Sequence, residues 1–264
     1  METKKKKTKK KNQNNKLNEH NKQEISNSSS NSTNSKDKVK YFLMIPFEQE
    51  DFITTFKNLS QKLEKENPID FDVNLLQKPQ KLHITLLVLD IKENKEKTEK
   101  IINIMNSILK DIKNIICDEF NFNFEKFDAF DSVKNAHVIF AKMIEDDNHY
   151  KLKMMTNLII KKFLEENILS EKDLQDMRIN EEYSDGVLMY TIKYHITLLN
   201  IKYLNRYLQK EKKQFKKDFD ATEILQCINN IQFPECRLDK INLCAMREDE
   251  SNGKYQVIHT FNIL

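Results

Sequence analysis

The sequence predicts an α+β domain that occupies residues 39–264. Segments with the two-residue period of strands alternate with segments of helical period throughout this range. A heptad, Lys-x-His-Ile-Thr-Leu-Leu, occurs twice, at residues 81–87 and 193–199, so we expect two related halves. A chain of 264 residues of which 39% are hydrophobic can fill one sizeable core or two lobes that share one.

The first 38 residues differ in composition from the rest of the chain. They are rich in Lys, Asn and Ser and nearly free of apolar side chains, so they cannot offset the entropy of ordering and we expect disorder. Residues 1–40 hold twelve lysines against four acidic residues, whereas the net charge of the whole chain is +3. The domain itself is therefore mildly acidic, which argues against broad electrostatic binding of nucleic-acid backbone.

Lysines are densest at residues 4–7 and 9–11. This pattern fits a nuclear-import signal or a polyanion-binding arm, and it fits a solvated tail equally well. We expect a nuclear or cytoplasmic location, or both.

The first half of the domain is predicted from the spacing of its apolar residues. An apolar run ended by Pro46 is typical of a buried strand, and helical spacing up to Asn67-Pro68 indicates the first helix. Alternating phenylalanines at 120–124 indicate a strand, which the apolar run at 136–144 is expected to join. The predicted elements are strand 39–45, helix 50–63, strand 81–91, helix 95–115, strand 120–124, strand 136–144 and helix 148–166.

The second half is more polar, and its prediction rests on fewer apolar residues. Residues 168–191 show no periodicity, which predicts a long loop that could serve as a lid. A Ser-Asn-Gly turn at 251–253 indicates that the last two strands form a hairpin. The predicted elements are strand 192–203, a lysine-rich helix at 205–217, a short helix near 224–228, and strands 237–247 and 254–263.

Composition excludes several classes of function. Two glycines in the whole chain leave no glycine-rich phosphate loop. No apolar run approaches the length of a membrane-spanning helix, and the N-terminus has no apolar signal segment, so we expect neither membrane insertion nor export. The four cysteines form no Cys-x-x-Cys pair and are expected to be reduced thiols, most of them buried.

The doubled heptad is the strongest candidate for a functional site. In a strand, alternate side chains share a face, so one polar row and one apolar row are expected in each copy. The polar rows are Lys81, His83 and Thr85 in the first copy and Lys193, His195 and Thr197 in the second. A single histidine of this kind is more often structural than catalytic, but two copies of one pattern are hard to assign to chance.

These side chains suit acid–base chemistry on a phosphate. Two imidazoles with pKa values near 6.5 can remove a proton from a hydroxyl or water and donate one to a leaving oxygen. Threonine hydroxyls can donate to the non-bridging oxygens, and the lysines either add positive charge or are solvent-exposed strand ends. A metal site is the competing interpretation, but no Asp, Glu or Cys recurs at a fixed offset from the heptads, so no metal or other cofactor is expected.

The remaining histidines lie in contexts unlike the heptads. His137 and His259 fall inside apolar strands and are interpreted as structural, and His149 lies at a predicted helix start. No Ser or Cys has the setting of an activated nucleophile, so acyl transfer is not expected.

The doubled motif resembles that of a known family. Two His-x-Thr strands are the mark of the 2H phosphoesterase superfamily, and the chain is similar to the A-kinase anchoring protein 7 family of central domains in segments 40–47, 83–90, 195–202 and 241–255. The resemblance implies a two-lobed fold with pseudo-duplicated antiparallel sheets, flanked by helices around a central groove. It also implies metal-independent cleavage of phosphodiester bonds in small nucleotides, short 2′,5′-linked oligonucleotides or RNA ends, and binding of AMP- or CMP-like nucleotides.

Residue roles follow from this resemblance by position. The implied catalytic residues are His83 and His195 as the acid–base pair, with Thr85 and Thr197 as phosphate donors. The implied substrate-binding residues are Thr85, His195, Ile196 and Thr197, to which Lys81 and Lys193 are added from the pattern itself.

The chain departs from the family in three places. Tyr194 stands where the family usually has proline, residues 168–191 form a longer connector, and no kinase-anchoring helix follows Leu264. Protein kinase A anchoring is therefore not expected. The alternative to an enzyme is a non-catalytic sensor or scaffold domain that binds a nucleoside monophosphate.

Overall fold

The computed structural model describes residues 40–91, 94–117, 120–184 and 186–264. The predicted disorder of residues 1–38 lies outside these residues. Within them, no helix is both long enough and apolar enough to cross a membrane.

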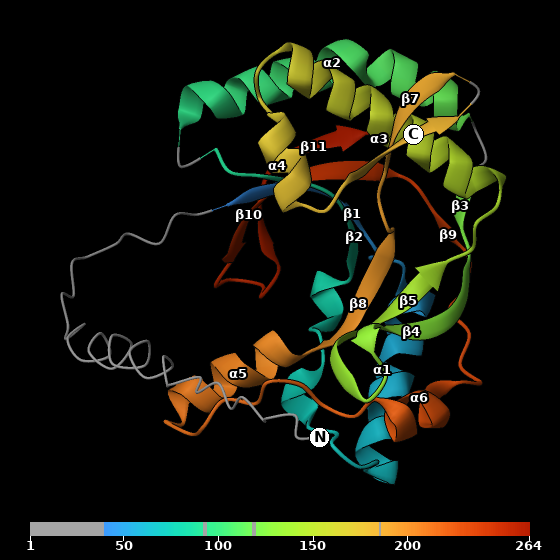
Figure 1. Ribbon diagram of the computed structural model, residues 1–264, viewed down its shortest axis with the longest axis vertical. Coiled ribbons are helices and arrows are strands. Elements are labelled where there is room, and N and C mark those ends of the chain that lie inside the picture. The colour runs from blue at the N-terminus through green and yellow to red at the C-terminus, as the bar shows by residue number, and fades with distance from the viewer. Residues whose placement is uncertain (1–39, 92–93, 118–119, 185) are drawn as a thin grey trace, which may run out of the picture. The chain divides into compact units, whose positions relative to one another are not determined.

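Helices and strands are interleaved along the described chain (Figure 1). The α-helices are α1 (Glu50–Glu66), α2 (Lys95–Ile116), α3 (Asp147–Glu165), α4 (Glu171–Asp176), α5 (Ile201–Lys210) and α6 (Thr222–Ile228), and the 3-10 turns are η1 (Val73–Leu75) and η2 (Pro79–Lys81). The strands are β1 (Tyr41–Pro46), β2 (His83–Leu89), β3 (Asn121–Phe122), β4 (Phe124–Ser132), β5 (Asn135–Met143), β6 (Asn180–Ser184), β7 (Val187–Thr191), β8 (His195–Asn200), β9 (Cys236–Arg237), β10 (Lys240–Glu248) and β11 (Tyr255–Asn262).

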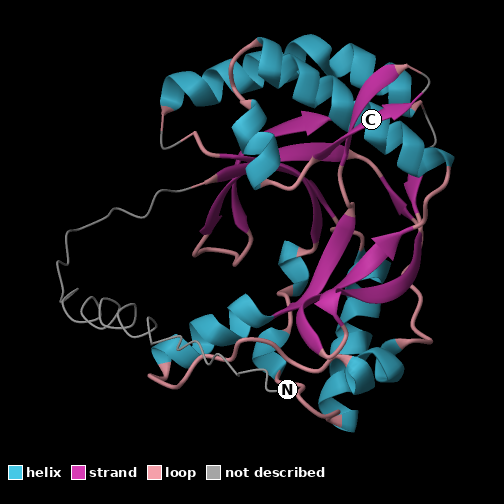
Figure 2. Ribbon diagram, in the orientation of Figure 1, coloured by secondary structure: helices cyan, strands magenta, loops and turns pink. Residues whose placement is uncertain are grey.

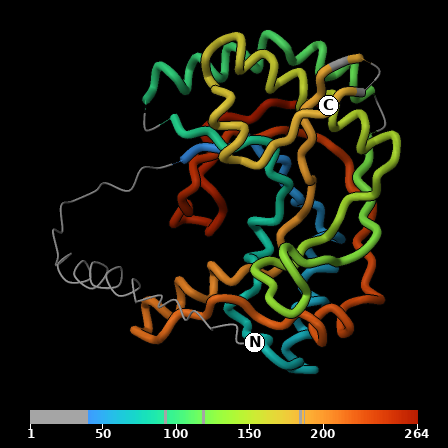
Figure 3. Tube along the Cα trace, viewed as in Figure 1, coloured from blue at the N-terminus to red at the C-terminus, as the bar shows by residue number. Residues whose placement is uncertain are grey.

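Seven of these strands form one antiparallel sheet in the order β11-β10-β1-β2-β8-β5-β4. The two heptad strands, β2 and β8, join its halves, and they pair at a single position, Ile84 opposite Ile196. Figure 3 shows the two strands running side by side at the centre of the described residues. The sheet is therefore two lobes, β11-β10-β1-β2 and β8-β5-β4, that meet at the doubled motif.

Helices pack on the sides of the two lobes that face away from each other (Figure 2). Helices α2 and α3 pack together and α2 contacts β11, whereas α1 packs on α6 and α6 on β4. Helix α1 buries Phe52, Phe56, Leu59 and Leu63, the apolar positions that predicted it. It ends at Glu66; the next residue, Asn67, donates its N–H to the Leu63 carbonyl at 2.8 Å and turns the chain away from the helix in the left-handed conformation (φ 44°).

The two lobes repeat one backbone irregularity beside each histidine. Strand β2 has one extra residue, Leu86, that no residue of β1 opposes, and β8 has Leu198 in the same relation to β5. Both bulges fall three residues after the histidine of their strand. Because bulges re-aim side chains and are common next to functional sites, this repetition agrees with the predicted relation between the halves.

Residues 168–191 are not the predicted irregular loop. They form α4 and the β6–β7 hairpin, which is pinned to α3 by the side chain of Asn157. The Asn157 amide donates to the Tyr190 carbonyl at 2.9 Å and accepts from the Tyr190 N–H at 2.6 Å. The Asn157 side chain thus satisfies backbone groups of β7 that a neighbouring strand would otherwise pair. The apolar spacing of residues 168–191 could not indicate this contact, because Asn157 lies outside that segment.

Two other predictions were wrong in position. The helix predicted at 205–217 begins at Ile201, because the Asn200 side chain caps it by accepting the Lys202 N–H at 2.9 Å, and it ends at Lys210. The strand predicted at 120–124 divides into β3, which pairs with β9, and β4, which is the partner of β5.

Candidate active site

Antiparallel pairing at Ile84 and Ile196 determines which residues of the two heptads are neighbours. A residue before Ile84 lies level with a residue after Ile196, so each histidine lies level with the threonine of the other strand. Both isoleucine side chains are fully buried, so the residues on either side of them point to the opposite face. We call this face, with the half-buried side chains of His83, Thr85, His195 and Thr197, the histidine face.

The backbone two residues upstream orients each imidazole. Nδ1 of His83 donates to the Lys81 carbonyl, and Nδ1 of His195 donates to the Lys193 carbonyl, both at 2.7 Å. Because a carbonyl can only accept, Nδ1 carries the proton of the neutral ring and Nε2 keeps its lone pair. On His83, this Nε2 accepts a hydrogen bond from Thr85 Oγ1 at 3.0 Å. Both rings are therefore in the tautomer that a general base at Nε2 requires.

Two aromatic rings pack against His83, and a cluster of charged side chains lies beside one of them. The rings of Phe42 and Tyr255 lie 5.5 and 5.4 Å from the imidazole, centre to centre. The Lys81 ammonium lies 4.8 Å from the centre of the Tyr255 ring and bonds to Glu248, as does Lys78. This side of the site therefore combines a phenol, two cations and one carboxylate.

The surroundings of His195 are more apolar. Phe130 lies edge-on at 4.8 Å and the buried Phe140 at 5.3 Å, centre to centre. The Lys193 ammonium lies 4.7 Å from the centre of each of these rings. The two halves thus repeat the arrangement of a lysine over an aromatic ring beside a histidine, with phenylalanine in place of tyrosine.

Burial controls the titration of both histidines. Burial is the largest cause that lowers the pKa of His83, the bond to the Lys81 carbonyl opposes it, and the charges of His195 and Lys81 add to it, so that the pKa is about 4. Burial also lowers the pKa of His195, and the Lys193 charge acts in the same direction. The charge of His195 is one of the causes that lower the pKa of His83, so the two imidazoles lie within electrostatic reach of each other.

The structure also places the other three residues that were predicted to bind substrate. Lys81 belongs to η2 rather than to the strand, and its side chain is 11% exposed. Lys193 is exposed and precedes β8, so neither lysine extends the polar row of its strand. The Ile196 side chain is fully buried, so this residue can reach a ligand only through its backbone.

Tyr194, which stands where the family usually has proline, continues the buried row of β8 and does not belong to the histidine face. The Tyr194 side chain is buried, packs against His149 at 5.4 Å and donates to the Leu152 carbonyl at 3.4 Å. It therefore fastens the start of β8 to α3.

Sequence reasoning missed Tyr255, which packs against His83, and two further polar residues, Gln77 and Tyr203. Gln77, which is 4% exposed, donates to the Tyr203 hydroxyl at 2.6 Å, and Tyr203 is close enough to Tyr255 for the two to influence each other's electrostatics. Burial raises the pKa of both tyrosines, so both hydroxyls stay protonated near neutral pH. Tyr255 closes the 241–255 segment of the family resemblance, and that position was the available signal.

No other cluster in the described ranges competes with the histidine face. Within these ranges no three metal-ligating side chains lie together. A hollow on α2 is lined by Glu96, Glu99, Lys100 and Glu166, and its carboxylates would repel a phosphate.

Comparisons with known proteins agree with this geometry. A family described as "AKAP7 2'5' RNA ligase-like domain" matches residues 39–263. No curated protein matches the chain. Among solved structures, TT0787 of Thermus thermophilus is 15% identical, with a TM-score of 0.50 over 85% of this chain and 97% of that one.

Two further solved structures are less similar. E. coli LigT complexed with phosphate is 12% identical over 85% of this chain and 96% of that one, with a TM-score of 0.45. Kluyveromyces marxianus Usb1 with uridine monophosphate is 9% identical over 86% and 97%, with a TM-score of 0.41. The predicted fold class, two pseudo-duplicated antiparallel lobes flanked by helices, is confirmed.

Proposed function

The chain belongs to the AKAP7 2′5′ RNA ligase-like domain family, and on that premise we propose that it is a metal-independent phosphodiesterase of the 2H type. The proposed substrates are small nucleotides and short oligonucleotides, including 2′,5′-linked ones. The observation that carries the proposal is the matched pair of Nδ1 bonds, which leaves an Nε2 acceptor on each histidine of one face.

The reaction needs one neutral and one protonated imidazole. The neutral Nε2 takes a proton from water or a ribose hydroxyl as its oxygen bonds to phosphorus. The protonated imidazole gives its proton to the leaving ribose oxygen as the second P–O bond breaks. One proton is thus accepted and one donated, and the two histidines exchange protonation states.

Hydroxyls and cations of the site face the developing charge on the phosphate. Thr85 and Thr197 donate to non-bridging oxygens, and each lies level with the histidine of the opposite strand. In the free protein the Thr85 hydroxyl bonds to His83 Nε2, so substrate must redirect this donor from the imidazole to the phosphate. Lys193, which is exposed above its aromatic rings, can add positive charge from the second lobe.

The test is cleavage of a 2′,5′-linked diadenosine monophosphate by the full chain in the presence of a chelator. His83→Gln and His195→Gln should each lower kcat/KM by at least about 100-fold, since general acid–base catalysis is worth about 10²–10⁴. The matched control is His137→Gln, whose imidazole bonds to Asp131 at the β4–β5 turn and should be dispensable. Retention of activity in either heptad variant would refute the assigned roles.

A non-catalytic domain that binds a nucleoside monophosphate is the second candidate. The observation that favours it is the lowered pKa of both histidines, which leaves few molecules with a protonated acid at neutral pH. Calorimetry with AMP and CMP beside the turnover assay separates the two. Binding without turnover across pH 4–9 would select this candidate over the enzyme.

A nuclear or cytoplasmic location is proposed on the lysine-rich residues 4–11 alone. Deletion of residues 1–38 should redistribute a fluorescent fusion from nucleus to cytoplasm without changing kcat/KM. An unchanged distribution would mean that the lysines are not an import signal.

A further inference from the structure

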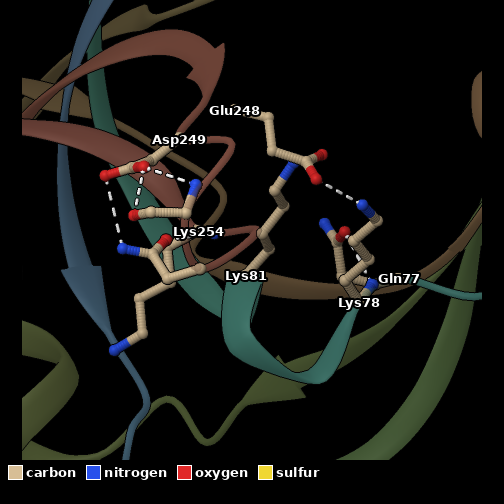
Figure 4. Close-up of polar contacts among 8 residues, drawn as sticks. Gln77, Lys78, Lys81, Glu248, Asp249 and Lys254 are labelled. Atoms are coloured by element: carbon tan, nitrogen blue, oxygen red, sulfur yellow. Dashed lines mark hydrogen bonds and ion pairs between the residues drawn. The ribbon is translucent and has the colours of Figure 1, made fainter.

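Next to the histidine face, one carboxylate bridges two lysines. Glu248 accepts from Lys78 Nζ through one oxygen at 2.5 Å and from Lys81 Nζ through the other at 2.7 Å. Figure 4 shows both lysines reaching the Glu248 carboxylate from the segment that leads into β2. Two cations against one carboxylate leave a net positive charge at this place.

This cation pair lies close to the proposed reaction centre. The Lys81 ammonium is 4.8 Å from the Tyr255 ring centre, which is 5.4 Å from the centre of the His83 ring. The ammonium therefore lies at most about 10 Å from the imidazole. Neighbouring phosphates of an extended nucleotide chain are separated by a comparable distance.

The position of the Glu248 side chain allows it to move away from the two lysines. It is 40% exposed and follows a break in the pairing of β10 with β11, where Ala245 lies opposite Gln256 but Glu248 opposite Tyr255. Lys81, in contrast, is the last residue of η2 and its side chain is only 11% exposed, whereas Lys78 directly precedes η2 and is 52% exposed. The bonds from Lys78 and Lys81 hold the pKa of Glu248 at about 2, so its carboxylate is ionised at neutral pH and competes with other anions.

The second lobe has no such arrangement. Lys193 occupies the position equivalent to Lys81, and among the described residues it forms no ion pair with a carboxylate. The duplication therefore supplies a lysine to both lobes, and the bridging carboxylate is particular to the first.

We propose that Lys78 and Lys81 form a subsite for a second, non-scissile phosphate of the substrate, and that Glu248 occupies this subsite until substrate displaces it. The proposal rests on the proposed function and narrows its substrate class to oligonucleotides that carry a further phosphate one nucleoside away from the cleaved bond. The Glu248 carboxylate stands in for two of the phosphate oxygens, each of which takes one ammonium.

The test compares two probes on the full chain. Both are 2′,5′-linked adenosine dinucleotides with a phosphorothioate link that resists cleavage, and one of them carries a terminal 5′-phosphate. Calorimetry at about 0.1 M salt should show that the terminal phosphate tightens binding about tenfold, the scale of one or two charged hydrogen bonds that are partly screened. Glu248→Gln should enlarge this preference by about threefold, because the competing charge is gone.

Lys78→Gln should abolish the preference and reduce the slope of log Kd against log salt by about 0.7, the value for one phosphate contact in a single strand. The matched control is Glu182→Gln, which removes a hairpin carboxylate bonded at 2.7 Å to Lys153, a lysine that is 15% exposed. This variant should keep the wild-type preference, and thermal melting should confirm that all variants fold.

The possible results distinguish a failure of the subsite proposal from a failure of the proposed enzymatic function. Equal affinity for the two probes with normal turnover of the cleavable dinucleotide overturns the subsite alone. A clear preference without turnover at any pH overturns the enzymatic proposal and leaves the subsite. The subsite is also overturned if Lys78→Gln still binds the 5′-phosphorylated probe more tightly than the other probe, or if Glu248→Gln reduces this difference in affinity.

Discussion

The pH dependence of cleavage tests the central argument, because it depends on how burial changes the two histidines. In the proposed mechanism the productive form has one imidazole protonated, and this form is most abundant between the two apparent pKa values of the pair. Burial lowers the pKa of His83 to about 4 and brings that of His195 below its ordinary value of 6.5. The maximum of kcat/KM should therefore fall between about pH 4 and 6.5, on the acid side of an unperturbed pair.

The magnitude follows from the titration. Above the upper pKa, each pH unit reduces the protonated acid about tenfold, so kcat/KM should fall about 100-fold between pH 6.5 and 8.5. Lys193→Gln removes a charge that lowers the pKa of His195, so its descending limb should move to higher pH. Lys161→Gln, on an exposed position of α3, removes the same charge elsewhere and should leave the profile unchanged.

The assay is the initial rate of dinucleotide cleavage at substrate concentrations well below KM, from pH 4 to 9 at constant ionic strength. NMR titration of the imidazole protons of His83 adds an independent reading, since His195→Gln should raise the pKa of His83. An optimum above pH 7, or a rate that is constant from pH 6 to 8.5, would show that these two buried imidazoles are not the acid–base pair.

Three further predictions concern particular side chains. Thr85→Val should lower kcat/KM by about tenfold to 100-fold while Thr85→Ser retains most of it, because the hydroxyl that bonds to His83 is lost only in the valine variant. The pKa of His83 is lower in the folded than in the unfolded protein, so the folded protein binds fewer protons. The free energy of unfolding should therefore decrease as pH falls from 6.5 towards 4, by about 2 kcal/mol after allowance for the partly exposed ring. Urea titrations should show a smaller pH dependence in His83→Gln than in the wild type, and an equal dependence would contradict this. Asn157→Ala should cost about 2–3 kcal/mol, because it leaves the β7 backbone unpaired in a buried place, and an unchanged urea midpoint would show that the hairpin does not need this amide.

The elements that the sequence predicted well are those with a regular apolar period. Helix α1 and strand β2 each bury one row of side chains and leave the other row more accessible, so the spacing of their apolar residues predicts the type of element. The β6–β7 hairpin has polar residues in β6 and is held by a side chain from α3, so its own period is weak. The Asp-Gly at 185–186 is a hairpin signal that could have been used, and Gly186 has the positive φ of 77° that such turns need.

The candidate site was predictable where it is duplicated and unpredictable where it is not. The heptad contains His83 and Thr85 together with the strand that aims them, so local sequence was sufficient. Tyr255 and Glu248 come from the last hairpin, far along the chain, and the strand order β11-β10-β1-β2 places this hairpin in the lobe that contains His83. Contacts of that range depend on strand order, which no single segment specifies.

The different surroundings of the two heptads explain how His83 and His195 could take different roles, one as acid and one as base. Two identical heptads in identical surroundings would give two histidines of equal pKa, and a substrate could bind in either direction with equal affinity. The surroundings differ: Lys81 is bridged to Glu248 beside a tyrosine, whereas Lys193 lies over phenylalanine rings. The positive charge of His195 lowers the pKa of His83, and in the proposed mechanism this favours His195 as the acid and His83 as the base. The residues that divide the roles therefore lie outside the repeated motif, and exchanging them between the lobes should exchange the roles.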